Sequence, residues 1–108
     1  LKPGAGAVLV GYGIDADVLH CADYRIATDT AQMQVTSADL AAADGSLPEV
    51  DAELPDILLG RAPARRHPDD VVFAYNSGMV VTDVALGRLM ADRALAQNRG
   101  QRVQLWSA

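Results

Sequence analysis

The sequence predicts an α/β fold with a mainly parallel sheet, and three features of the chain indicate it. Short apolar or β-branched runs, such as residues 7–10 and 71–75, alternate with segments of helical pattern. Each run is continuous, as is typical of strands that are buried on both faces of a parallel sheet. The expected order of elements, β-α-β-α-α-β-α-β, is that of a layered α/β structure, and 108 residues suffice for one small domain.

The first part of the chain is expected to hold two strands and a short helix. Residues 7–10 form an apolar run that Gly11-Tyr12-Gly13 closes, as at the end of a buried strand. Asp15 is a good N-cap for a short amphipathic helix, because its carboxylate accepts hydrogen bonds from free backbone N–H groups. Residues 24–28 are the second strand candidate, although Arg25 interrupts their apolar pattern.

Two helical stretches are expected in the middle of the chain. Residues 29–47 are predicted to be helical with a break, because Ser37 precedes an alanine-rich segment as an N-cap would, and Gly45 follows as a stop. Residues 49–59 form the other stretch. Its start is uncertain from the sequence, since Pro55 is tolerated only in the first turn of a helix.

The last part of the chain contains the clearest strand and the longest helix. Residues 71–75 are β-branched and aromatic and are bounded on both sides by polar residues, which predicts a strand. After a turn at residues 76–78, a long helix is predicted from about residue 79 to residue 98, ended by Gly100. Polar and apolar residues alternate over 101–106, which predicts a half-exposed antiparallel strand in a different sheet.

Composition and charge exclude several classes of protein. Half of the residues are hydrophobic, which argues against a disordered chain. Nine basic residues against fourteen acidic ones give a net charge of -5, which argues against nucleic-acid binding, and no apolar run approaches the roughly 20 residues of a membrane span. Cys21 is the single cysteine, so we expect no disulfide, no metal site and a reducing, cytoplasmic setting.

Glycines and polar residues follow two of the expected strands, at the ends where parallel sheets bind ligands. Gly11 and Tyr12 follow the first strand, and Asn76, Ser77 and Gly78 follow the strand at 71–75. These positions are candidates for ligand contact through side chains and close backbone approach. The alternatives stay open: Asn76 or Ser77 caps the following helix, and the first glycines form a tight turn without the full Gly-x-Gly-x-x-Gly pattern.

A basic loop offers a second, weaker candidate. Its arginines either hold a phosphate or form an ordinary solvated surface; they are Arg61, Arg65 and Arg66.

In the long helix, Arg88 and Asp92 stand one turn apart and are predicted to pair with each other.

Several segments together resemble the ornithine cyclodeaminase/µ-crystallin family. Residues 53–63 are similar to its "AEL-x-x-(V/I)-L-x-G-x-x-P" segment, and residues 72–83 to its "F-(D/K)-S-x-G-x-A-(V/I)-x-D" segment. Leu1-Lys2-Pro3-Gly4 matches the "(V/L)-K-P-G" that introduces a strand in this family, and residues 89–94 add to the likeness. The resemblance spans essentially the whole chain, in order.

The resemblance implies a two-domain protein that binds NAD or NADP and forms a homodimer. Residues 1–76 are then the C-terminal half of a Rossmann domain, and residues 77–108 the helix and strand that return to a dimerisation domain. The nucleotide fingerprint and the main substrate-binding Lys and Arg are expected upstream of Leu1, in keeping with a start that lacks Met. Asn76 takes the position of the family's serine near the nicotinamide. The cofactor-binding residues are therefore expected to be Gly11, Tyr12, Asn76, Ser77 and Gly78.

The function that the resemblance implies is hydride transfer on an amino acid, imine or ketoacid. No catalytic residue is identified, because Gly11-Tyr12-Gly13-Ile14-Asp15 stands where cyclodeaminases have Asp-Ser/Cys-Pro-Gly-Lys with its catalytic Asp. Two other functions stay open: a non-catalytic NAD(P)-binding or accessory subunit of the same family, and an autonomous domain that binds an anion at Ser77-Gly78. The 108-residue chain alone is expected to show no turnover and negligible NAD(P)H affinity.

Overall fold

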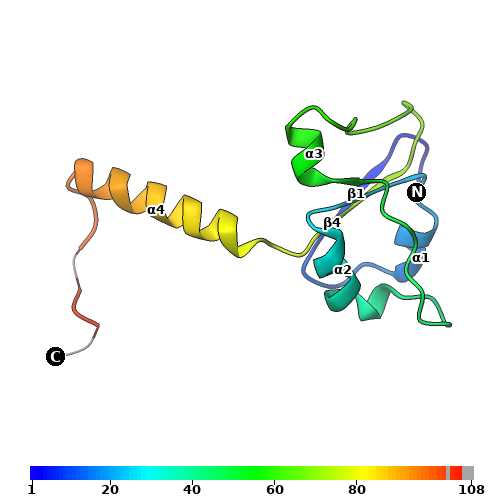
Figure 1. Cartoon of the computed structure of the whole chain (residues 1–108), viewed down its shortest axis with the longest axis horizontal. Helices are drawn as coiled ribbons and strands as arrows, with labels where there is room; N and C mark the ends of the chain where they lie inside the picture. The colour runs from blue at the N-terminus through cyan, green and yellow to red at the C-terminus, as the bar shows by residue number, and fades with distance from the viewer. Residues whose placement is uncertain (102, 106–108) are drawn as a thin grey trace. The chain divides into compact units, whose positions relative to one another are not determined.

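The computed structural model describes residues 1–101 and 103–105. The chain divides into two compact units, one from Leu1 to Gly78 and one that begins at Met79. The first unit contains a four-stranded, wholly parallel sheet in the order β1-β4-β2-β3. Figure 1 labels two neighbouring strands of this sheet, β1 and β4. The strands are β1 (Gly6–Val10), β2 (Tyr24–Ala27), β3 (Ala52–Glu53) and β4 (Val72–Asn76). The predicted α/β class with a parallel sheet is therefore confirmed.

One face of the sheet is covered by the short helices α1 (Ala16–His20) and α2 (Thr30–Thr36) and the 3-10 turn η1 (Ala38–Leu40). The register aligns Leu9 and Ala27 with Tyr75, so these three side chains lie on the same face. Together with fully buried Phe73 they form the main core against one apolar residue from each covering element: Leu19, Met33 and Leu40. Asp15 caps α1 as predicted, accepting a hydrogen bond from the Asp17 N–H at 3.0 Å.

The opposite face is covered only in part. Helix α3 (Leu54–Leu58) and the segment after it pack against a smaller cluster, which consists of Tyr24, Ile26, Ala52 and Val72. Over β1, Val8 and Val10 are 62% and 72% exposed. The prediction that residues 7–10 are buried on both faces is therefore wrong for this chain, because β1 is an edge strand with one open face.

The segment predicted as a helix at 49–59 contains a strand and a shorter helix. Residues Ala52–Glu53 pair in parallel with β2, and the Asp51 N–H donates to the Arg25 carbonyl at 2.9 Å. The helix begins only at Leu54, with Pro55 in its first turn, where proline's missing N–H costs no hydrogen bond. Pairing with β2 therefore overrides the helical pattern before Pro55.

The stretch predicted as helical at 29–47 is helical only as far as Leu40. Ser37 occupies the N-cap position of η1 as predicted, but its side chain makes no capping bond there: it is fully buried, and its hydroxyl donates to the Met33 carbonyl at 2.6 Å, at the end of α2. Residues 41–47 form a turn instead, in which the Gly45 N–H donates to the Ala42 carbonyl at 2.8 Å. Alanine content alone did not distinguish this turn from a helix.

The second unit contains helix α4 (Val80–Ala96), somewhat shorter than predicted. The helix is terminated by Asn98, which has a left-handed conformation (φ 50°). The Asn98 N–H donates to the Leu95 carbonyl, and the Arg99 N–H donates to the Ala94 carbonyl. This is a Schellman arrangement in which Asn98, rather than Gly100, supplies the left-handed residue. Arg88 and Asp92 pair at 2.9 Å, as predicted.

The last predicted strand, at 101–106, is not observed over the residues that the structure describes. Residues 101 and 103–105 are irregular, and Arg102 and Trp106 lie outside the described residues. In the described part of the chain, no helix is both long enough and apolar enough to cross a membrane.

Candidate functional site

A cavity of about 170 Å³ lies at the carboxyl ends of β1 and β4, within the first unit. Parallel neighbours place both strand ends at the same edge of the sheet, since Val10 pairs with Asn76. The residues that line the cavity are Gly11, Tyr12, Thr36, Tyr75, Asn76 and Ser77. The structure thus brings together four of the five residues predicted as a cofactor site, while Gly78 is not among those that line the cavity.

Ser77 is held by the end of the neighbouring strand. Its hydroxyl oxygen lies 2.9 Å from the Thr28 hydroxyl oxygen, and its backbone N–H donates to the same Thr28 oxygen at 3.3 Å. Thr28 is only 5% exposed, and its own N–H donates to the Tyr75 carbonyl at 3.0 Å. Two hydrogen bonds to a buried side chain therefore give Ser77 a defined position at the cavity.

Tyr75 is anchored on the other side of β4. Its phenol oxygen lies 2.9 Å from the hydroxyl of Thr36, at the last turn of α2, and the Thr36 hydroxyl in turn donates to the Gln32 carbonyl at 2.8 Å. The tyrosine is 7% exposed and belongs to the main core. Tyr75 therefore belongs to the core and also lines the cavity.

Asn76 organises the turn after β4. Its side-chain oxygen accepts the Gly78 N–H at 3.0 Å, and Gly78 has a φ of 73°, a conformation that favours glycine. Helix α4 begins at Val80 with Met79 as its N-cap and no side-chain cap bond. The alternative in which Asn76 or Ser77 caps this helix is therefore wrong, and the anion site proposed for a helix start at Ser77-Gly78 loses its basis.

The other wall comes from the turn after β1. Gly11 has a φ of 89°, and a Cβ atom there would meet no atom within 4 Å, so the backbone faces open space. Tyr12 is 86% exposed. No residue that lines the cavity is an Asp, Glu, Lys, Arg, His or Cys. The cavity therefore suits a neutral polar group that accepts and donates hydrogen bonds.

Sequence reasoning missed two residues that line the cavity, Thr36 and Tyr75, and one that holds Ser77 in place, Thr28. Thr28 was detectable, because it ends a strand at the same edge of the sheet as Asn76. Tyr75 was assigned to the strand alone, and its hydroxyl contact was not foreseen. Thr36 carries no signal in the sequence, because only the packing of α2 on β4 brings it to the cavity.

Each arginine of the basic loop has a partner within the protein, which favours the interpretation of this loop as an ordinary surface. Arg61 lies 2.8 Å from the Asp56 carboxylate. Arg65 donates to the backbone carbonyl of Asp70. Arg66 lies 3.1 Å from the Asp51 carboxylate, with its guanidinium 4.7 Å from the centroid of the Tyr24 ring.

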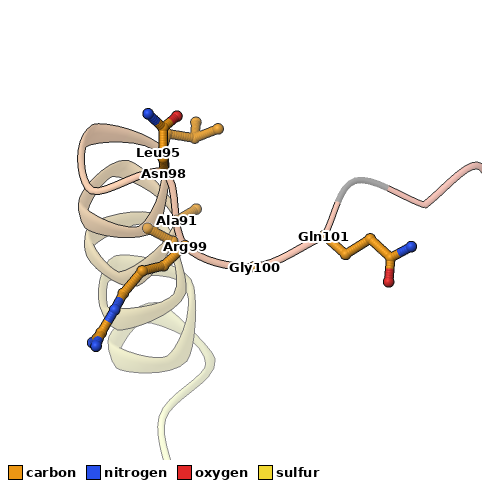
Figure 2. A pocket seen from close by; sticks show the side chains of 7 residues that line it. Ala91, Leu95, Asn98, Arg99, Gly100 and Gln101 are labelled. Carbon is orange, nitrogen blue, oxygen red and sulfur yellow. The ribbon is translucent and has the colours of Figure 1, made fainter.

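A second hollow lies in the unit that begins at Met79. It measures about 580 Å³ and lies between the last turns of α4 and the segment that follows (Figure 2). Its walls are Ala91, Ala94, Leu95, Asn98, Arg99, Gly100 and Gln101, and in Figure 2 the Arg99 side chain extends away from Gln101. It contains none of the predicted site residues. Over residues 1–101 and 103–105, no three His, Cys, Asp or Glu side chains are grouped to hold a metal ion.

Comparison with known proteins agrees with this architecture. A probable ornithine cyclodeaminase from Bordetella pertussis Tohama I has a similar structure, with a TM-score of 0.69 and 33% sequence identity. The match covers 96% of this chain and 36% of that protein, so this chain spans little more than a third of the relative's length. No protein-family model and no curated protein sequence matches the chain.

The fold and the match together define the class of this protein. It is an α/β protein with a Rossmann-like parallel sheet. The resemblance predicted from the sequence is confirmed: over nearly its whole length, the chain is related to the ornithine cyclodeaminases.

Proposed function

We propose that this chain is part of an NAD(P)-dependent oxidoreductase that acts on an amino acid, imine or ketoacid. Residues 1–76 would be the C-terminal half of its Rossmann domain, and residues 77–108 part of its dimerisation domain. Gly11, Tyr12, Asn76 and Ser77 would form one wall of the nicotinamide site, with Gly78 shaping the turn behind Asn76. The bound cofactor supplies the hydride chemistry, and these residues bind and orient its ring.

The observation that carries this proposal is the uncharged cavity at the carboxyl ends of β1 and β4. Ligands of parallel α/β sheets bind at this edge. A volume of about 170 Å³ is below the roughly 300–1,000 Å³ of a pocket for a whole ligand, so it suits one end of a larger molecule. With no cation in its lining, it fits the nicotinamide ring end of a dinucleotide, which carries no negative charge, rather than the phosphates.

A second candidate function is a non-catalytic NAD(P)-binding or accessory subunit. It is supported by the same lining, in which the tyrosines are the only titratable side chains. General acid-base catalysis is mostly performed by His, Asp, Glu, Lys or Cys, and none of these residue types lines the cavity. In this alternative the chain binds the cofactor, and no reaction takes place at this wall.

The proposal includes a homodimer in the cytoplasm. Helix α4 has no buried residue, and seven of its large apolar side chains are 47–77% exposed. A helix that is apolar around much of its surface usually packs against another layer or subunit. Cys21 is a free, exposed thiol, which is in keeping with a reducing compartment.

The test compares the gene product expressed from its own start codon with the 108-residue chain. The gene product is expected to bind NADH or NADPH and to reduce NAD⁺ or NADP⁺ with at least one amino acid as the hydride donor, whereas the chain alone shows neither property. Asn76→Ala and Ser77→Ala should weaken cofactor binding. Gln34→Ala is the control, because it removes an exposed amide from α2 outside the cavity.

The outcomes separate the two candidates. Binding without turnover on any amino acid, imine or ketoacid would favour the accessory subunit. No binding of either cofactor by the gene product would refute both, and so would equal affinities for the Asn76→Ala, Ser77→Ala and Gln34→Ala variants.

A further inference from the structure

The turn between η1 and β3 contains the one Asp-Gly pair of the sequence, Asp44-Gly45, and both residues are exposed. Two hydrogen bonds of 2.8 Å close the turn, one from the Ala42 N–H to the Ser46 carbonyl and one from the Gly45 N–H to the Ala42 carbonyl. A Cβ atom at Gly45 would meet nothing within 4 Å, so this amide is open to solvent. An aspartate side chain and an unhindered backbone amide are therefore neighbours on the surface.

An aspartate followed by glycine has a reaction open to it that needs only water. The Gly45 nitrogen attacks the Asp44 Cγ and forms an N–C bond, while the hydroxyl of the protonated carboxyl leaves as water with the amide proton. A second water then opens the five-membered imide. Opening at one carbonyl restores aspartate, and opening at the backbone carbonyl gives isoaspartate, in which the main chain runs through Cβ and Cγ. One water is lost and one is gained, and nothing is oxidised or reduced.

We propose that Asp44 is a site of spontaneous conversion to isoaspartate, and that the Ser46 hydroxyl restrains this conversion. The hydroxyl donates to the Asp44 Oδ1 at 2.6 Å, and the Ser46 N–H donates to the same oxygen at 2.9 Å. These two bonds hold the carboxylate on Ser46, and the Gly45 N–H is held by Ala42. The reaction therefore requires the turn to open first. This inference is independent of the proposed function.

The bonds to Ser46 also keep the carboxyl group in its less reactive form. The Ser46 hydroxyl, then the Ser46 N–H, lower the pKa of Asp44, and the charge of His20 at the end of α1 has a smaller effect in the same direction. An ionised carboxylate lacks the hydroxyl that leaves as water. The conversion is therefore expected to be slow at neutral pH and to become faster as pH falls toward the lowered pKa.

Isoaspartate would disturb the contacts on both sides of the turn. It adds one carbon to the main chain before Gly45, so the two 2.8 Å bonds of the turn lose their register. Leu40, before the turn, is fully buried in the main core, and Leu47, after it, packs against that core. The modified chain is therefore expected to unfold at a lower urea concentration than the unmodified chain.

The experiment incubates the 108-residue chain in H₂¹⁸O at physiological temperature over several weeks. Each opening of the imide adds one ¹⁸O, whether the product is aspartate or isoaspartate. Trypsin then releases residues 26–61 as one peptide, and electron-transfer fragmentation locates the label and the isoaspartate. Asp39 is the internal control, because it is also exposed and is followed by the bulky Leu40. We expect ¹⁸O and isoaspartate at Asp44, more in mildly acidic than in neutral buffer, and neither at Asp39.

Two variants test the chemistry and the role of Ser46. Asp44→Glu keeps the carboxylate but would have to form a six-membered imide, which closes far more slowly, so no label is expected at this position. Ser46→Ala should raise the rate at Asp44 by about two- to tenfold, as the loss of one hydrogen bond predicts. Glu49→Ala, at another exposed position of the same segment, is the matched control and should leave the rate within about twofold.

Three results would overturn the inference. The site is refuted if Asp44 gains no label in the folded chain but gains it when the chain is unfolded in urea. The role of Ser46 is refuted if Ser46→Ala reacts at the rate of the unmodified chain or more slowly, and the slower rate would mean that the hydroxyl assists the reaction. Equal labelling of Asp39 and Asp44 in Ser46→Ala would attribute its faster rate to general unfolding.

Discussion

Gly4 is a glycine at which the addition of one methyl group is expected to lower the free energy of unfolding strongly. Its φ is 75°, and a Cβ atom would lie 2.9 Å from the carbonyl oxygen of Pro68. Its N–H donates to the Asp69 carbonyl at 2.8 Å, which joins the start of β1 to the loop before β4. Gly4→Ala therefore introduces both a left-handed alanine and a contact with a backbone atom that cannot rotate away.

The expected loss in the free energy of unfolding is about 2–5 kcal/mol. A left-handed non-glycine residue costs about 1–2 kcal/mol, and overpacking against fixed atoms adds about 1–3 kcal/mol. The loop cannot yield easily, because the His67 N–H donates to the Asp70 carboxylate at 2.8 Å. Since small domains are stable by only about 5–15 kcal/mol, this is a large part of the total.

Two other glycines separate the contribution of backbone strain from that of the contact with Pro68. Gly60 has nearly the same φ, 72°, but nothing lies within 4 Å of its Cβ position, so Gly60→Ala should cost only the strain of about 1–2 kcal/mol. Gly6 has open space and no positive φ, so Gly6→Ala should be neutral or slightly stabilising in its strand. Urea unfolding followed by circular dichroism gives the three values for the full chain. Equal losses for Gly4→Ala and Gly60→Ala would refute the contact with Pro68, and a neutral Gly4→Ala would refute the turn itself.

Two further predictions concern charged groups outside the cavity. The Ser46 hydroxyl and backbone N–H both donate to the Asp44 carboxylate and lower its pKa, so its contribution to stability is present above its unfolded pKa and is lost as pH falls through the lower folded pKa. Ser46→Ala should raise the Asp44 pKa toward its ordinary value in a ¹³C carboxyl titration, and an unchanged pKa would contradict the assignment. Arg66→Gln should lower stability by about 1 kcal/mol, because it removes a half-exposed pair with Asp51 and a cation-π contact. Inorganic phosphate should change the thermal unfolding temperature of the unmodified chain and of this variant equally. A larger increase for the unmodified chain would indicate that the basic loop binds phosphate.

The sequence was sufficient to place much of the site. Strand β4 and its turn were predicted because a β-branched and aromatic run is followed by Asn76, Ser77 and a glycine. The rule that parallel strands present their carboxyl ends at one edge then placed Gly11 beside Asn76, and the register of β1 with β4 agrees with it. This placement of the strand ends is confirmed because the signals are local to one strand end and depend on backbone geometry.

The predictions that failed concern contacts between distant segments. Strand β3 is two residues long and exists through its pairing with β2, which no local pattern reveals. Ser37 resembles an N-cap in the sequence, yet its hydroxyl closes the end of the preceding helix. For the basic loop, the sequence left a phosphate site and a solvated surface open. The ion pairs of Arg61 with Asp56 and of Arg66 with Asp51 favour the surface.

The sequence by itself therefore determined the class of fold, the strand ends that meet at one edge of the sheet, and the family that the chain resembles. Only the tertiary structure decided the chemical character of that edge. Thr28, just after β2, and Thr36, in α2, hydrogen-bond Ser77 and Tyr75, which line the cavity. These contacts depend on packing between segments that are distant in the sequence, and they are not encoded in the order of residues along one strand.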